Sequence, residues 1–261
     1  MQFVDVKVHD TTATLTLDRP SKRNALSRQT LDDFQLAVSD LHQEKRVRSV
    51  IMIGKGTDFC AGLDLSELAS LTGEQAEDQL SELHSFWGKW SETLEQLLRF
   101  PKPVIAAVDG SVLGAGLALA LACDVIVSSD RARFAANAPE RGLVGATTAA
   151  LLGFRLGGSM AARLSLIPES IDASEAFRIG LTAQVTTSDQ IWVEAQRLGE
   201  LCAAVSPQAL AATKRTLNEG IGEAMLSQLY ASAATSATAT STPWAEEGVA
   251  AFLEKRHPKW D

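Results

Sequence analysis

Two glycine-containing segments have the residue types needed to bind a developing negative charge. One is Gly114-Ala115-Gly116, which opens the apolar run 117–122, and the other is the upstream segment Phe59-Cys60-Ala61-Gly62-Leu63-Asp64. In each, small residues let the backbone approach a ligand closely, and a helix is expected to begin immediately afterwards. Unpaired backbone N–H groups and the positive end of the helix dipole then point the same way. Such an arrangement stabilises an enolate or a thioester oxyanion, so we predict that the two segments form one oxyanion-binding site.

The composition predicts a globular protein that carries no metal site. The chain has 261 residues, of which 46% are apolar and 21% charged, enough for one large domain or a domain with an appendage. A net charge of −8 argues against a nucleic-acid or membrane partner. The apolar stretch 104–127 is interrupted by Asp109, Gly110 and Asp124, which favours buried elements over a membrane span. Three cysteines without metal-ligand spacing, and no secretory signal, predict a cytoplasmic protein.

Hydrophobic periodicity predicts an α/β core followed by helices only. Strands are expected at 3–9, 12–18, 47–53, 104–109, 125–128 and 133–135, and helices at 27–41, from 64, 75–99 and 114–122. Asp64-Leu65-Ser66-Glu67 has the form of a capping box. Later helices are expected at 191–204, 207–219, 224–238 and 244–256. Within them, the Ala/Ser/Thr-rich stretch 231–242 fits either a flexible linker or a closely packed helix. We therefore predict a core over 1–188 and a helical region over 189–261 that packs on the core and on neighbouring subunits.

Short motifs in a fixed order carry a resemblance that covers essentially the whole chain. They are Leu17-Asp18-Arg19-Pro20, Asn24-Ala25-Leu26, the segment 59–65, the segment 101–110 that leads to the glycine pair, Ala122-Cys123-Asp124-Val125-Ile126, and the segment 252–258. In these motifs the chain resembles the enoyl-CoA hydratase/isomerase family, also called the crotonase family.

The resemblance implies a crotonase-like core of repeated ββα turns, a homotrimer or homohexamer, and a bound acyl-CoA thioester of the kind found in fatty-acid metabolism. It implies no cofactor beyond the coenzyme A that the substrate carries. The backbone N–H groups of Leu63 and Ala115 would form the oxyanion hole. The residues implied to bind the coenzyme are Lys22, Arg23, Ala61, Gly62, Leu63, Asp64, Gly114 and Lys255, the last of which could reach a neighbouring subunit's ligand.

Several of these residues also have a plain structural interpretation. Asp64 fits a helix cap better than a catalytic acid. Lys22 and Arg23 are as compatible with solvated loop charges as with phosphate contacts. Cys60 fits a small buried apolar group better than a nucleophile, since no basic partner is near it in sequence.

The chain departs from the family where hydratases carry two glutamates, one to accept a proton and one to donate it. The first position falls on Ala118. The second falls on Ala138 in an ungapped alignment, whereas a two-residue slip places Glu140 there. The third place where relatives put a carboxylate falls near Gly145-Ala146. Alanine cannot transfer protons, so weak hydratase activity at most is expected.

Glu140 is thus the best available base, and a single carboxylate suits double-bond migration. It is at least as compatible with a loop charge paired to Arg141. His84, on the variable helix, fits a surface residue better than a catalytic one. Two interpretations stay open, namely an enzyme that stabilises a thioester enolate and a non-catalytic acyl-CoA-binding protein. A Glu140 side chain near the oxyanion site favours the first, and one that points to solvent favours the second.

Overall fold

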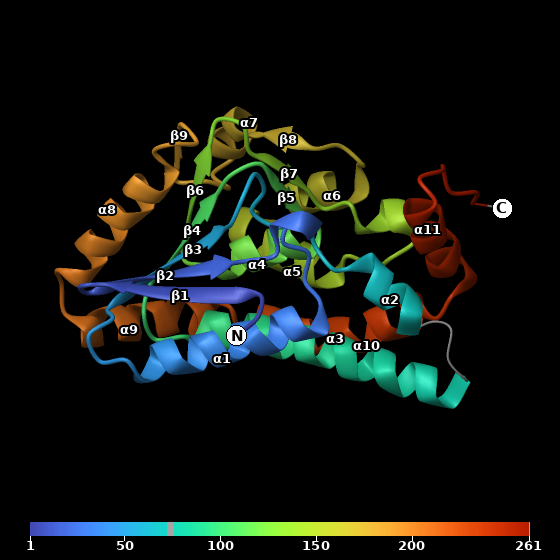
Figure 1. Ribbon diagram of the computed structural model, residues 1–261, viewed down its shortest axis with the longest axis horizontal. Coiled ribbons are helices and arrows are strands. Elements are labelled where there is room, and N and C mark those ends of the chain that lie inside the picture. Colours follow the sequence, from blue (N-terminus) through green and yellow to red (C-terminus); the bar gives the residue numbers. More distant parts are fainter. Residues whose placement is uncertain (72–75, 261) are drawn as a thin grey trace.

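A central six-stranded sheet forms the core of the computed structural model, which describes residues 1–71 and 76–260 (Figure 1). In spatial order its strands are β1 (Val4–His9), β2 (Thr12–Leu17), β3 (Ser49–Gly54), β4 (Val104–Val108), β6 (Val125–Ser129) and β9 (Gln184–Thr186). The β1–β2 hairpin is antiparallel and every later pairing is parallel. The mixed α/β core predicted from the sequence is therefore confirmed.

A second, smaller sheet joins β5 (Ser111–Leu113), β7 (Arg133–Ala135) and β8 (Ile171–Asp172). Two isolated parallel bridges extend this arrangement, Leu26 to Leu63 and Cys60 to Val112. Segments that are far apart in sequence, 23–26, 60–64, 111–115 and 133–138, consequently lie next to one another in that order. This order positions the candidate site.

Helices surround both sheets. They are α1 (Arg28–Gln43), α2 (Leu65–Leu71), α3 (Ala76–Arg99), α4 (Ala115–Ala122), α5 (Ala146–Leu156), α6 (Gly158–Leu166), α7 (Ala173–Arg178), α8 (Ile191–Ala203), α9 (Pro207–Arg215), α10 (Glu223–Thr240) and α11 (Pro243–Leu253). Single turns are η1 (Pro20–Lys22), η2 (Ala138–Arg141) and the π-helical η3 (Thr216–Ile221). Among the described residues, no helix is long and apolar enough to cross a membrane.

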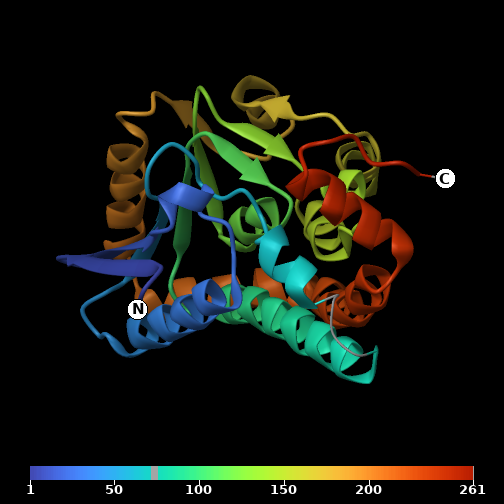
Figure 2. The ribbon, with the colours of Figure 1, turned by 45° about the vertical axis from the view of Figure 1, so that its right-hand side comes forward.

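The central sheet is covered on both faces (Figure 2). On one face Ile51, Ile105 and Val127 form a buried cluster with Ile191 and Ala195 of α8. The larger core lies on the other face, between the sheet and helices that include α1, α3 and α4. Burial on both faces explains why β3, β4 and β6 are continuous apolar runs rather than alternating ones.

Most predicted elements appear within a few residues of their expected bounds. Ser27 caps α1 by accepting a hydrogen bond from the Thr30 N–H. The predicted start of the long helix at Gln75 lies outside the described residues. Residues 231–240 belong to α10, so the helical interpretation of the Ala/Ser/Thr-rich stretch is confirmed. Its small side chains allow close packing, and the hydroxyl groups of Ser232, Ser236 and Thr240 are buried.

The C-terminal helices pack on the chain's own core, with α10 against α3 and α5 and with α11 against α2 and η2. Leu226 and Leu229 of α10 are buried within the chain and need no partner subunit, whereas Trp244 and Phe252 of α11 are 60% and 46% exposed. The boundary between a core over 1–188 and a helical region over 189–261 stays a prediction, as does the contribution of that region to oligomerisation.

Candidate active site

The two glycine-containing segments meet at one cavity of about 340 Å³, which Leu63 and Ala115 both line. Leu26 donates its N–H to the Gly62 carbonyl oxygen at 2.8 Å and accepts from the Asp64 N–H at 2.9 Å. In this parallel pairing the residue between the two partners, Leu63, directs its own N–H away from Leu26. That donor is thereby available on the other side of its segment.

The second donor belongs to the first residue of α4. Gly114 precedes the helix with a φ of +50° and donates its own N–H to the Ala135 carbonyl oxygen at 2.8 Å. Ala115 follows as the first helical residue, and the N–H groups of a first helical turn have no intrahelical acceptor. The Ala115 N–H, at the positive end of α4, has no acceptor among the residues that the structure describes.

Gly62 brings these donors together. A Cβ at this position would lie 3.5 Å from the Ala115 nitrogen and 2.9 Å from the Leu113 carbonyl oxygen, and the φ of Gly62 is +98°. Gly116 has the same role on the other side of the contact, since a Cβ there would lie 2.4 Å from the Cys60 carbonyl oxygen. Both glycines allow backbone to touch backbone, so the two segments form one wall of the cavity.

Cys60 lies behind this wall and not in the cavity. Its side chain is fully buried, and its Sγ donates to the Asn24 carbonyl oxygen at 3.1 Å. Burial raises the pKa of the Cys60 thiol to about 12. The thiol is consequently neutral near pH 7, in agreement with the interpretation of Cys60 as a small buried apolar group.

Asp64 also lines the cavity, but its carboxylate has partners. It pairs with Arg19 at 2.7 Å and accepts hydrogen bonds from the N–H and the hydroxyl of Ser66. Burial alone would raise the pKa of Asp64, but the bonds from Ser66 and Arg19 outweigh it and lower the pKa. Asp64 therefore caps α2 as an anion.

The capping box predicted at this helix start is only half formed. The Asp64 N–H already donates to Leu26, so it cannot bond the Glu67 side chain. Glu67 accepts instead from the Arg28 N–H at 3.1 Å. The backbone pairing between 23–26 and 60–64 thus takes the place of the local hydrogen bond between the Asp64 N–H and the Glu67 side chain.

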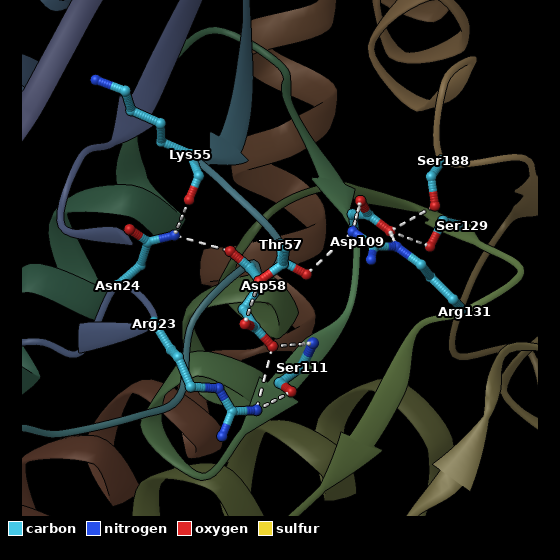
Figure 3. A network of polar contacts seen from close by, with 10 residues as sticks. All are labelled: Arg23, Asn24, Lys55, Thr57, Asp58, Asp109, Ser111, Ser129, Arg131 and Ser188. Carbon is cyan, nitrogen blue, oxygen red and sulfur yellow. Dashed lines mark hydrogen bonds and ion pairs between the residues drawn. The ribbon is translucent and has the colours of Figure 1, made fainter. Parts of the chain in front are cut away.

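Lys22 and Arg23 line one end of the cavity, as the resemblance implies for a phosphate-binding loop. The Arg23 guanidinium is already engaged by Asp58 at 3.1 Å and by the Ser111 hydroxyl (Figure 3). Lys22 is exposed and forms no ion pair among the described residues. Lys22 is thus the freer of these two cations.

Asp58 and Asp109 anchor the loops behind the oxyanion segments (Figure 3). Asp58 accepts from the Ser111 N–H at 3.0 Å, which joins the segment before Cys60 to β5. Burial would raise the pKa of Asp58, but hydrogen bonds from Arg23, Ser111 and Thr57 lower it to about 2.

Asp109 accepts from Arg131 and from the hydroxyl groups of Ser129 and Ser188. Arg131 also donates to the Thr57 carbonyl oxygen at 3.1 Å. The two carboxylates therefore fix both oxyanion segments from behind through side-chain hydrogen bonds.

Of the positions where the resemblance expects carboxylates, Ala138 and Gly145 line the cavity, and a Cβ at Gly145 would lie 3.3 Å from the Ala138 Cβ. Ala118 is fully buried inside α4 and is not a lining residue. The choice between the ungapped and the slipped alignment stays a prediction.

Glu140 does not line the cavity. Its nearest charged partner is Arg141, at 3.8 Å, and its side chain is 36% exposed. Lys255 is exposed and likewise outside the cavity lining. His84 is exposed on α3, where its Nδ1 lies 2.9 Å from the Leu80 carbonyl oxygen. The structure thus does not bring these three residues to the oxyanion segments.

The far end of the cavity is apolar and includes two tryptophans. Trp87 and Trp90 are buried, and their indole N–H groups donate to Thr240 and Thr147 at 3.1 and 3.2 Å. Phe252 of α11 also lines the cavity. These side chains can cover an aliphatic or aromatic group.

Two polar residues at this end were not singled out from the sequence. Asn137 lines the cavity, and its Oδ1 would lie 3.3 Å from a Cβ at Gly114. Arg141 lines the cavity with its guanidinium over the Phe252 ring, 4.8 Å from the centroid. The polar residues that interrupt an apolar loop after the strand 133–135 were the available signal, but only the fold shows which of them face the cavity.

Comparisons with known proteins agree with this architecture. The enoyl-CoA hydratase/isomerase family model matches residues 7–261. A probable enoyl-CoA hydratase of Mycobacterium tuberculosis is 31% identical over 247 residues, which cover 94% of this chain and 93% of that protein. The 2,3-dehydroadipyl-CoA hydratase of Escherichia coli is 34% identical over 253 residues, with 94% and 92% covered.

A crystal structure of an enoyl-CoA hydratase from Mycobacterium avium has a TM-score of 0.86 at 30% identity and covers 99% of each chain. With the fold, the paired glycine segments and these matches together, the chain belongs to the enoyl-CoA hydratase/isomerase family and has the crotonase fold.

The Asp58 network predicts a pH-dependent loss of stability in Asp58→Asn. Because the folded-state pKa of Asp58 is lowered to about 2, its contribution is complete above the unfolded-state pKa and is lost as the pH falls toward 2. The wild type should exceed the variant by about 1–2 kcal/mol in free energy of unfolding at pH 7, and by about half of that at pH 3.

Urea denaturation at both pH values measures this difference, with Asp5→Asn, which alters an exposed ion pair, as the control that changes little. A gap between wild type and Asp58→Asn that is the same at pH 7 and pH 3 would contradict the assignment.

Proposed function

We propose that this protein binds an acyl-CoA thioester and polarises its carbonyl group with the N–H groups of Leu63 and Ala115. The observation that carries the proposal is the meeting of these two donors at one cavity, with Gly62 as the contact between their segments. Two backbone donors that converge on one oxygen stabilise the charge that an enolate places there.

The cavity has a different character on each side of this donor pair. The segment 23–26 lies beyond 60–64, so the cations of the η1 loop are on one side. The segment 135–138 lies beyond 111–115, so the apolar end is on the other side. A thioester fits this division, with the coenzyme phosphates toward Lys22 and Arg23 and the acyl group toward Trp90 and Phe252.

The names of the relatives support the same substrate class. The Escherichia coli relative is named as a hydratase of 2,3-dehydroadipyl-CoA, and the mycobacterial relatives are named as enoyl-CoA hydratases. All of these names refer to coenzyme A thioesters.

A second function, an acyl-CoA-binding protein without chemistry, is favoured by one specific observation. Among the lining residues that the structure describes, Asp64 is the one carboxylate, and it is paired with Arg19 and hydrogen-bonded by Ser66. Glu140 lies outside this lining. Addition of water across a double bond requires a group that accepts a proton and a group that donates one. We therefore propose enolate stabilisation with weak hydratase activity, and binding alone if no turnover is found.

The ligand class is tested by calorimetry with butyryl-CoA, free coenzyme A and butyrate. Butyryl-CoA should bind most tightly, because it alone combines the phosphates with a carbonyl group for Leu63 and Ala115. Gly62→Ala should weaken butyryl-CoA more than free coenzyme A, since the added Cβ crowds Leu113 and the Ala115 nitrogen. Equal affinity of the wild type for butyrate and butyryl-CoA would refute the assignment.

A base installed at Ala138 tests whether the oxyanion hole is competent. Ala138→Glu places a carboxylate in the cavity, where it can remove an α-proton from a bound thioester whose enolate the two N–H groups stabilise. Exchange of the α-protons of butyryl-CoA in D₂O, followed by NMR, should be faster than with wild type by about 10²–10⁴-fold.

Ala138→Gln is the matched control, with the same shape and no base. The Gly62→Ala change, made in the Ala138→Glu background, should remove the gain. If Ala138→Glu binds butyryl-CoA but exchanges its protons no faster than Ala138→Gln, the donors at Leu63 and Ala115 do not stabilise an enolate.

We also propose that the protein is cytoplasmic and assembles as a homotrimer or homohexamer. Apolar side chains at the surface support the assembly, among them Leu166 at 78%, Ile221 at 70% and Trp244 at 60% exposure. Light scattering at micromolar concentration should give three or six times the 27.9 kDa chain mass. A monomer mass would refute this assembly.

A further inference from the structure

Arg141 is a lining residue whose charge the proposed function does not use. Its side chain is 27% exposed, yet its guanidinium forms no hydrogen bond with any part of the chain that the structure describes. Of the other described arginines only Arg215 shares this property, and Arg215 is 72% exposed. Within the described ranges 1–71 and 76–260, the one ion-pair partner of Arg141 is Glu140, at 3.8 Å, which is beyond hydrogen-bond distance.

The backbone of Arg141 and the plane of its guanidinium are nevertheless held in place by neighbouring residues. Gly248 of α11 packs so closely that a Cβ there would lie 2.3 Å from the Arg141 carbonyl carbon, and the next residue, Gly142, has a φ of +65°. The guanidinium lies over the Phe252 ring at 4.8 Å. Figure 1 shows α11, in red, against the chain that leads into α5. Stacking fixes the plane of a guanidinium while its N–H groups point outward from the edge.

Arg141 is on the acyl side of the oxyanion donors. The segments 23–26, 60–64, 111–115 and 133–138 lie side by side in that order. Lys22 and Arg23 adjoin the first of these segments, and η2, which ends at Arg141, follows the last. A thioester held between Leu63 and Ala115 with its phosphates toward Lys22 therefore extends its acyl group toward Arg141.

The lining charges leave one cation free at each end. Arg23 is paired with Asp58, and Asp64 with Arg19, so both pairs are close to neutral. Lys22 remains at the coenzyme end and Arg141 at the acyl end. A partly buried guanidinium loses hydrogen bonds to water, and this loss is compensated only if a ligand supplies new acceptors. A carboxylate is a suitable ligand, because its two oxygens accept two parallel hydrogen bonds from the guanidinium.

We propose that Arg141 recognises a carboxylate at the far end of the acyl group, so that the preferred ligands are coenzyme A thioesters of dicarboxylic acids. This inference rests on the proposed acyl-CoA function and adds the substrate class. Arg141 is a specificity-determining residue in this scheme, and Glu140 competes with the ligand for its charge.

The test compares thioesters that differ only at the end of the acyl chain. Calorimetry with the purified full chain measures the affinities of butyryl- and succinyl-CoA, of pentanoyl- and glutaryl-CoA, and of hexanoyl- and adipyl-CoA. In at least one pair the wild type should prefer the carboxylate by about ten- to a hundredfold, the range for hydrogen bonds to a charged partner. The preference should decrease as salt is added.

Three variants assign the preference to Arg141. Arg141→Gln should lose it while its affinity for the neutral thioester and for free coenzyme A stays at the wild-type level, which also shows that the variant is folded. Lys22→Gln, which removes the cation at the other end, should weaken both members of a pair equally. Glu140→Gln should raise the preference, because the competing anion is gone. Arg215→Gln is the control for removal of an exposed positive charge.

The outcomes separate this inference from the function on which it rests. If no thioester binds, the proposed function fails, and this inference fails with it. If neutral thioesters bind but no pair shows a preference, or if the preference persists in Arg141→Gln, the inference is wrong and the proposed function stands. If Arg141→Gln weakens free coenzyme A as much as the carboxylated thioester, Arg141 contacts the coenzyme phosphates and the inference is again wrong.

Discussion

Direct contact between two backbone segments gives the candidate site its shape. Residues 60–63 and 111–116 touch without intervening side chains, because Gly62 and Gly116 have no Cβ at the two closest points. This contact converts two loops into one wall and leaves two N–H groups at its surface. The Asp58 and Asp109 networks hold the wall from behind. The donors are thus fixed before a ligand arrives, which is the condition for effective electrostatic stabilisation.

The described polar groups of this site are mainly backbone donors and paired charges. At 118 and 138, where the resemblance expects carboxylates, the chain has alanine, and the Asp64 carboxylate is paired with Arg19 and caps α2. A family fold can keep its binding geometry while the groups that set the reaction change, because backbone donors come from the fold and acids and bases come from single side chains.

Two neighbouring residues on one turn can differ in whether they line the cavity. Glu140 and Arg141 are adjacent in η2, yet Arg141 lines the cavity and Glu140 does not. In a 3₁₀ turn successive side chains point about 120° apart, so one residue of register decides which charge faces the ligand. Gly142 in the αL conformation and the close approach of Gly248 of α11 fix that register, so the positive charge of Arg141 lines the cavity and the negative charge of Glu140 does not.

Local patterns along the sequence were enough to predict most of the helices and strands. Hydrophobic periodicity and caps predicted α1, α3 and α4 within a few residues, because those signals are local. The glycine-containing segments predicted a close approach of backbone to backbone, and the resemblance assigned the donors within them to Leu63 and Ala115. Which side chains face the cavity depends on the tertiary structure. The pairing of Arg23 with Asp58, the half-formed capping box at Asp64 and the stacking of Arg141 on Phe252 all join segments distant in sequence. Such contacts depend on how the elements pack against one another, and no local pattern along the chain records that packing.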